Sequence, residues 1–186
     1  MAQSKILLDT SSYLRLARSI HPLLSQEFGE RRFCCYVLRE LDEELGRSGR
    51  LRTSFAWALE EEYRLNRVRP LTIGRRDRNA IRNANEFIWE TVQSEQAGLS
   101  RVDALCLAHG FALGIPVVTD DESMVRMADA FQLDVMRSLD LMKLMLDHGR
   151  IEMTKVREMV AYWRYAKDAP ADLAGHVRRL FGEGIP

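Results

Sequence analysis

The chain has few cysteines, scattered histidines and no net charge, and each shortage argues against a class of protein. Its three cysteines are the adjacent Cys34 and Cys35 and the distant Cys106. This set fits a reduced intracellular protein better than a disulfide framework or a zinc site. The four histidines have no metal-ligand spacing. Lys and Arg together number 27, as do Asp and Glu, so no overall basic field indicates nucleic acid.

Long apolar stretches are missing as well. No run approaches the length of a membrane span, and the N-terminus lacks the apolar stretch of a signal peptide. The 186 residues are 46% apolar and 29% charged, which is ordinary for one globular domain. The sequence therefore predicts a soluble, cytoplasmic protein without membrane contact.

Short apolar runs alternate with amphipathic segments over most of the chain. This alternation predicts an α/β fold, with a doubly wound parallel sheet of about five short strands flanked by helices. The predicted strands are 5–8, 32–36, 68–73, 117–119 and 133–136, and Pro70 makes the third a weak edge candidate. The predicted helices are 11–19, 37–45, 51–66, 76–96, 101–113, 122–131, 139–148, 153–166 and 171–181.

The last quarter of the chain is predicted to be helical throughout. We therefore expect a domain over residues 1–138 and a C-terminal helical extension over 139–186, packed on that domain or on a partner. Its apolar residues suit core or dimer packing better than a ligand site. They are Leu141, Leu144, Met145, Met159, Val160 and Trp163.

Acidic residues fall where a parallel sheet would bring them to one edge. Asp9 ends the first strand, and Asp120 and Asp121 follow the strand 117–119. Glu40 and Asp103 lie in the first turns of helices that begin at the same edge. Ligands bind open α/β sheets beyond the carboxyl ends of the strands, and gathered carboxylates repel one another unless a cation lies among them. The pattern predicts a divalent-metal site.

Each carboxylate also has an ordinary structural interpretation. Asp9 and Asp120 stand at favoured N-cap positions, and Ser100 with Asp103 has the form of a capping box. Glu40 equally fits a solvated helix face. Amphipathicity favours Glu44 over it, but Glu44 lies ~6 Å further from the rim along the helix axis. Capping explains any one of these acids more readily than it explains the set.

A basic segment runs from Arg64 to Arg82, with seven arginines and one acid, Asp77. It predicts a track for a phosphate backbone. The candidate RNA contacts are Arg75, Arg76 and Arg78. Pairing with the acidic run 60–62 on a solvated surface explains the arginines equally well.

Four short motifs together resemble the PIN-domain ribonucleases, a family that includes VapC-like proteins and predicted nucleic-acid-binding proteins of prokaryotes. Residues 6–11 resemble the opening strand with its terminal Asp, and residues 37–41 look like the family's V-x-x-E-L. Residues 102–108 are similar to its D-A-x-x-L-A helix, and residues 117–121 resemble its T-x-D turn. The resemblance covers about residues 4–138. The tail resembles C-terminal helices appended in some PIN-domain families, and it is longer than in compact VapC-like toxins.

The resemblance implies a PIN-like fold and an endoribonuclease that uses Mg²⁺ or Mn²⁺. The catalytic and metal-ligating residues that it implies, direct or through water, are Asp9, Glu40, Asp103 and Asp121. It supports Glu40 over Glu44, and it makes Asp120, Ser11 and Thr119 candidates for holding those ligands in place. Whether Asp120 or Asp121 is the direct ligand stays open. The expected partners are RNA, an antitoxin protein if the chain is a toxin, and a second copy of the chain.

Two other functions are compatible with an acidic rim. One is a catalytically silent PIN-like module that binds nucleic acid or a protein partner. The other is a phosphoryl-transfer hydrolase with an aspartyl nucleophile, which needs a second Asp two positions after Asp9, where Ser11 stands. No Ser–His or Cys–His nucleophile arrangement is evident in the sequence.

Overall fold

Four parallel strands form the centre of the molecule. A computed structural model describes residues 2–69, 71–182 and 184. The strands are β1 (Ser4–Leu8), β2 (Phe33–Val37), β3 (Val117–Val118) and β4 (Val135–Met136). Their order in the sheet is β2-β1-β3-β4. Leu8 pairs with Val37 on one side and with Val118 on the other, so three strands end at the same level. The predicted α/β fold with a parallel sheet is confirmed.

The sheet has four described strands, so the expectation of about five was too high. The missing strand is 68–73: residues 68–69 form a turn and a bend, and residues 71–74 are irregular. Pro70, which made this segment doubtful, lies outside the described residues. Leu71 is buried, so the segment is fixed by one apolar anchor while it connects two helices.

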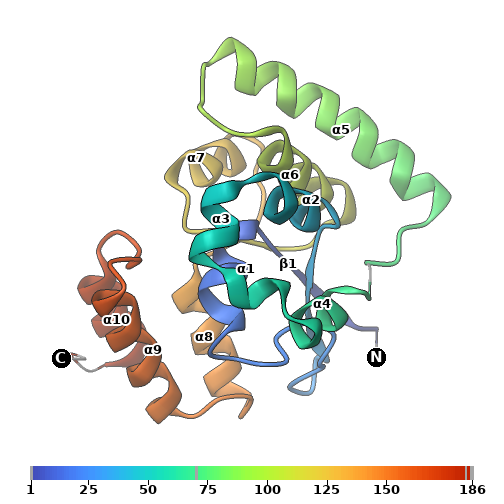
Figure 1. Cartoon of the computed structure of the whole chain (residues 1–186). Coiled ribbons are helices and arrows are strands. Elements are labelled where there is room, and N and C mark those ends of the chain that lie inside the picture. The colour runs from blue at the N-terminus through green and yellow to red at the C-terminus, as the bar shows by residue number, and fades with distance from the viewer. Residues whose placement is uncertain (1, 70, 183, 185–186) are drawn as a thin grey trace.

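Helices cover both faces of the sheet (Figure 1). One face carries α1 (Thr10–Ala17), α8 (Ser138–Asp147), α9 (Met153–Tyr165) and α10 (Leu173–Phe181). The other carries α5 (Arg75–Ser94), α6 (Arg101–Leu113) and α7 (Glu122–Ala130). The side chains of β1 alternate between the two cores: Ile6 and Leu8 belong to the first, and Leu7 belongs to the second. This alternation explains why the strand is apolar throughout.

The segment between β2 and α5 differs most from prediction. The predicted helix 37–45 begins later, because Val37 still pairs in β2 and α2 is Glu40–Arg47. The predicted helix 51–66 is broken into α3 (Gly49–Ser54), a 3₁₀ turn (Ala56–Leu59) and α4 (Glu61–Arg67). Ala58 is fully buried, and its carbonyl accepts a hydrogen bond from the buried Arg67 at 2.9 Å. Tertiary contacts therefore override the helical pattern here.

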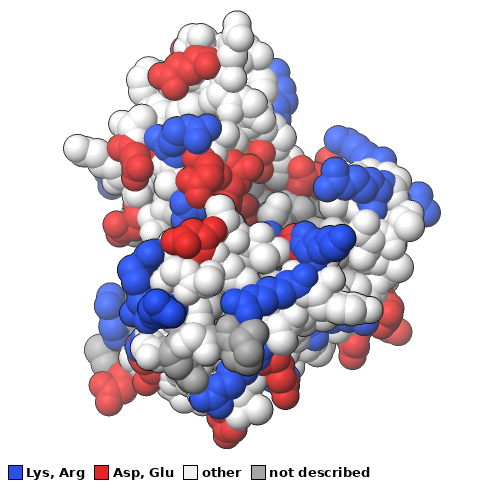
Figure 2. All heavy atoms as spheres, turned by 90° about the vertical axis from the view of Figure 1, so that its left-hand side faces the viewer, with Lys and Arg blue, Asp and Glu red and all other residues white. Residues whose placement is uncertain are grey.

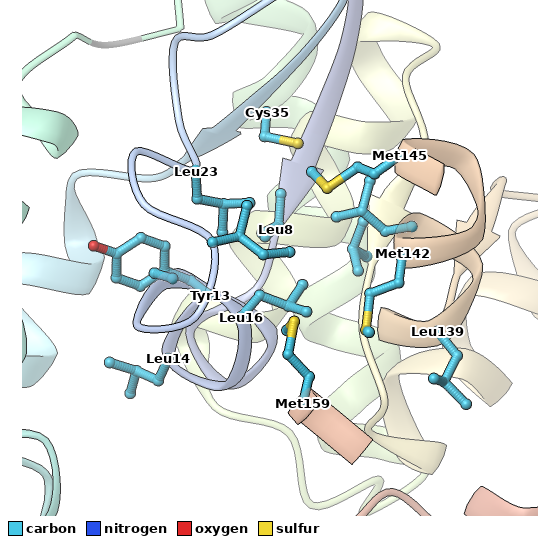
Figure 3. Close-up of a cluster of buried hydrophobic side chains, with 14 of the residues drawn as sticks. Leu8, Tyr13, Leu14, Leu16, Leu23, Cys35, Leu139, Met142, Met145 and Met159 are labelled. Atoms are coloured by element: carbon cyan, nitrogen blue, oxygen red, sulfur yellow. The ribbon is translucent and has the colours of Figure 1, made fainter. Parts of the chain in front are cut away.

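The C-terminal helices pack on the sheet. Leu8 and Leu16 share a buried cluster with Met142 and Met159 (Figure 3). The indole of Trp163 donates a hydrogen bond to the carbonyl of Arg15 at 3.4 Å. The core continues across residue 138, and the proposed division into 1–138 and 139–186 stays a prediction. None of the helices in the described part of the chain is both long enough and apolar enough to span a membrane.

Candidate acidic site at the carboxyl edge of the sheet

Asp9 is held at the junction of β1 and α1. It caps α1: Oδ1 accepts a hydrogen bond from the Ser12 amide at 2.6 Å. Oδ2 accepts one from the Thr119 hydroxyl at 2.7 Å. The residue is only 5% exposed. Burial raises the pKa of Asp9 from 3.8 to about 6; the two hydrogen bonds oppose this rise, and the charge of Asp120 adds to it. A buried carboxylate of this kind gains from a nearby cation.

The Asp9–Thr119 contact lies where the strand order reverses. The chain leaves β1 for β2 on one side, whereas β3 pairs with β1 on the other. Thr119 directly follows β3, so the contact joins the carboxyl ends of these two neighbouring strands. This is the position at which open α/β sheets bind ligands.

Asp103 and Asp9 line the same small cavity. It belongs to the first turn of α6, where the Ser100 amide donates to its Oδ2 at 2.9 Å and its own amide donates to the Ser100 hydroxyl at 3.1 Å. The predicted capping box is therefore present. The cavity measures about 10 Å³, close to the space that one water molecule needs. Its lining consists of Leu8, Asp9, Thr10, Leu38, Leu41, Val102, Asp103 and Cys106.

Glu44 reaches the same neighbourhood. The hydroxyl of Thr10, which lines the cavity, donates a hydrogen bond to Oε2 of Glu44. Burial raises the pKa of Glu44, the bond from Thr10 opposes the rise, and the charge of Asp103 adds to it. The pKa of the buried Cys106 is raised by burial and then by Asp9, Asp103 and Glu44. The charge of Asp103 therefore acts on Glu44.

Glu40 lies one turn earlier on the same helix. Together with Glu44 it lines a hollow of about 480 Å³, and Val102 belongs to both this hollow and the small cavity. From the sequence, Glu40 is expected to be the ligand because Glu44 lies further from the rim along the helix axis. The Thr10 contact shows that this distance does not keep Glu44 away from the cavity. Glu40 as a ligand stays a prediction, with Glu44 beside it.

Asp121 and Asp120 have different surroundings. Asp121 is exposed and caps α7, accepting hydrogen bonds from the amides of Ser123 at 2.7 Å and Met124 at 3.0 Å. Asp120 is mostly buried; it pairs with Arg15, and its Oδ2 accepts the Ser138 hydroxyl at 2.6 Å. The carboxylate of Asp120 therefore connects α1 to the start of α8.

The remaining predicted residues lie apart from the cavity. Ser11 is exposed in the first turn of α1. Arg75, Arg76 and Arg78 are exposed in the first turn of α5. Within residues 2–69, 71–182 and 184 none of these three arginines forms an ion pair, with the acidic run 60–62 or otherwise. Seen from the side of α7 and the C-terminal helices, acidic and basic side chains are interspersed over the surface (Figure 2).

Two cavity residues were missed in the sequence. Thr10 adjoins Asp9, and Cys106 follows Asp103 by three positions, which places it on the same helix face. The spacing was a usable signal for Cys106. No local pattern shows that the Thr10 hydroxyl meets Glu44, because that contact joins two elements 34 positions apart.

The donor groups suit one mode of cation binding and not another. Among the described residues no three His, Cys, Asp or Glu side chains are grouped closely enough to hold a metal ion. A closed cage of protein ligands is therefore not preformed. Mg²⁺ is usually bound through one or two carboxylates and keeps several waters. The pair Asp9 and Asp103, which lines one cavity, supplies the two carboxylates of that sparse mode, and the cavity itself has room for about one of the waters.

Comparisons with known proteins add little to this geometry. Neither the family models nor the curated proteins include a match to the chain. Among solved structures, the chain is similar to the crystal structure of FitAcB from Neisseria gonorrhoeae. The alignment covers 72% of this chain and 98% of that chain at 17% sequence identity, with a TM-score of 0.46. A likeness at this level carries no argument about function.

Proposed function

We propose that the chain is an endoribonuclease that depends on a divalent cation, Mg²⁺ or Mn²⁺, and that its site is the cavity between Asp9 and Asp103. The observation that carries the proposal is that these two carboxylates, from different elements, line one cavity at the topological switch point. Burial makes ionised Asp9 less favourable, and a cation beside it would offset that cost.

The protein positions the carboxylates before any cation arrives. Ser12 and Thr119 hold the two oxygens of Asp9, and the Ser100 amide holds Oδ2 of Asp103. Glu44, held by Thr10, is an additional carboxylate beside the cavity. Glu40 and Asp121 complete the proposed set, acting through water. A divalent cation at this position supplies an acidified water and offsets charge on the leaving oxygen of a phosphodiester.

The choice of RNA as substrate rests on the resemblance of residues 37–41 and 102–108 to PIN-domain ribonucleases. The exposed arginines at the start of α5 are consistent with a phosphate-binding surface. A toxin role with an antitoxin partner, and a homodimer, belong to the same proposal and rest on the resemblance alone.

A second function is favoured by one observation. Asp9, Asp103 and Asp121 all accept hydrogen bonds from backbone amides at helix N-termini, which is a sufficient structural role for an aspartate. A catalytically silent module that binds nucleic acid or a protein partner would need nothing more from them.

Cleavage of a labelled RNA pool in Mg²⁺, Mn²⁺ or EDTA separates the two functions. The decisive variant is Asp103→Asn, and Asp140→Asn is its matched control, because Asp140 likewise accepts a hydrogen bond from the amide of the N-cap residue, Arg137, at the start of α8. We expect cation-dependent cleavage by the wild type and by Asp140→Asn, and loss of cleavage in Asp103→Asn. Equal activity of both variants would contradict the proposed site.

A further inference from the structure

One flank of α5 carries a stripe of basic and aromatic residues. Arg78, Arg82, Asn85 and Trp89 follow one another at spacings of four, three and four, which places them on one side of the helix. The neighbouring face is formed by Ile81, Ala84, Ile88 and Val92, which are buried. Arg78 and Arg82 are exposed, and Asn85 and Trp89 are half-buried. The stripe spans ~16 Å at 1.5 Å per residue.

The stripe reaches the first turn of α6. The guanidinium of Arg101 stacks over the ring of Trp89, with its Cζ 4.5 Å from the ring centroid. Arg101 is exposed and is the first residue of α6, two positions before Asp103. Helix α5 packs along α6 (Figure 1). A line of cationic and aromatic groups therefore runs from the start of α5 to the turn that carries Asp103.

Arg78 and the neighbouring Arg101 are placed against the dipoles of their own helices. Arg78 lies in the first turn of α5, and Arg101 opens α6, where positive charge is disfavoured. In the described part of the chain, neither these two nor Arg82 forms an ion pair. Their positive charges are therefore available to an external anion. The aromatic ring beside them indicates that this anion is a nucleic acid, whose bases stack on planar groups.

We propose that this flank binds single-stranded RNA and leads it into the cavity between Asp9 and Asp103. Proteins bind single strands with a row of cations for the backbone and aromatic rings on which bases stack. Arginine planes also stack on bases, so a base can lie on the outer side of Arg101 while Trp89 supports the guanidinium from within. The proposal names the substrate form for the proposed nuclease. Of the three candidate contacts it keeps Arg78 and Arg75, which lies three positions earlier on the same side of the helix, and it excludes Arg76.

The opposite flank of α5 supplies the control. Arg76 lies about 200° around the helix axis from Arg78, on the side of the exposed Phe87, which packs against Phe131 with ring centroids 5.6 Å apart. Arg76 has the same charge, the same exposure and the same first-turn position as Arg78. A diffuse electrostatic attraction would use both arginines, whereas a track along one flank would use only Arg78.

Fluorescence anisotropy with a labelled single-stranded RNA in EDTA measures binding without cleavage. Each of the single variants Arg78→Ala, Arg82→Ala and Arg101→Ala should flatten the slope of log affinity against log salt by about 0.7. Arg76→Ala should leave the slope unchanged. Trp89→Leu, which removes the ring that supports the Arg101 guanidinium, should weaken binding by no more than Arg101→Ala does, and Trp89→Phe, which keeps a ring, should weaken it less. Arg101→Lys should remain weakened, because an ammonium does not stack. Melting temperatures exclude variants that fail to fold.

Different results separate this inference from the proposed function. The proposed role of the stripe is contradicted if the wild type does not bind the single strand or binds an RNA duplex as tightly. It is also contradicted if Arg76→Ala weakens binding as much as Arg82→Ala does. If the stripe variants bind RNA as tightly as the wild type and still cleave it, the nuclease proposal stands and the proposed role of the stripe is contradicted. If the stripe variants bind RNA more weakly but the wild type does not cleave RNA in Mn²⁺, the stripe binds RNA as proposed and the nuclease proposal is contradicted.

Discussion

The Thr119 hydroxyl donates a hydrogen bond to Oδ2 of Asp9 at 2.7 Å, although the two residues are 110 positions apart in the chain. The contact exists because Leu8 pairs with Val118 in the sheet, so the residues that follow β1 and β3 meet at one level. Sheet register therefore fixes the position of the carboxylate. The same register makes Asp9 buried and brings it to the cavity that Asp103 lines from α6.

Asp9 should make the metal-free protein less stable as the pH rises. Its pKa in the folded state is about 6, against 3.8 as the ordinary value. The folded state therefore binds more protons between these values, and the free energy of unfolding falls as the pH rises from about 4 to about 6. At ~1.4 kcal/mol per pKa unit, the loss is about 3 kcal/mol. Asp9→Asn removes this contribution.

Urea denaturation in EDTA at pH 4 and pH 7.5 measures the effect. Relative to the wild type, Asp9→Asn should gain on the order of 3 kcal/mol between the two pH values. The exposed Asp129→Asn serves as the control and should show no such gain. Parallel pH profiles for the wild type and Asp9→Asn would mean that Asp9 is not buried as described.

Asp120 should matter for stability more than for cation binding. Its buried carboxylate pairs with Arg15 and holds Ser138. Asp120→Asn leaves Arg15 without its buried partner, at a cost of about 3 kcal/mol in the free energy of unfolding. Asp168 contacts the same arginine at 3.1 Å, but its side chain is 45% exposed, so Asp168→Asn should cost less than about 1 kcal/mol. Loss of Mn²⁺ affinity in Asp120→Asn at unchanged stability would instead make Asp120 a ligand.

Glu44 and Glu40 should differ in their effect on cleavage. Glu44 accepts a hydrogen bond from Thr10, and the charge of Asp103 raises its pKa. Glu44→Gln should therefore lower the metal-dependent cleavage rate by roughly tenfold or more, which corresponds to about 1.4 kcal/mol of activation free energy. Glu40→Gln should have the smaller effect. Rates at saturating Mn²⁺, with melting temperatures alongside, decide between them. An inactive Glu40→Gln with an active Glu44→Gln would restore the residue that the V-x-x-E-L resemblance favours.

The sequence predicts those parts of the structure that depend on local patterns. Helix α6 begins after Ser100 and ends at Gly114 as expected, because a capping box and a left-handed glycine mark its ends. The edge that carries Asp9 and Asp103 follows from the alternation of strands and helices. The predicted helix 51–66 fails, because burial of Ala58 and its bond from Arg67 outweigh helical periodicity.

Contacts between distant elements were beyond the reach of the sequence. Thr10 contacts Glu44 only because packing places α2 beside α1. Arg101 stacks on Trp89 only because packing places α5 beside α6. Spacing within one helix shows which residues share a face, such as Arg78 and Trp89. It does not show which element that face contacts. The sequence therefore could not decide which of Glu40 and Glu44 lies closer to the cavity.

Calorimetric titration of Mn²⁺ at pH 7.5 tests the central claim most directly, because it measures cation binding at the Asp9–Asp103 cavity without any assumption about the substrate. We predict that the wild type and Asp140→Asn bind Mn²⁺ with the same affinity, and that Asp9→Asn combined with Asp103→Asn abolishes binding. Affinity that is absent from the wild type, or unchanged in the double variant, would contradict the account.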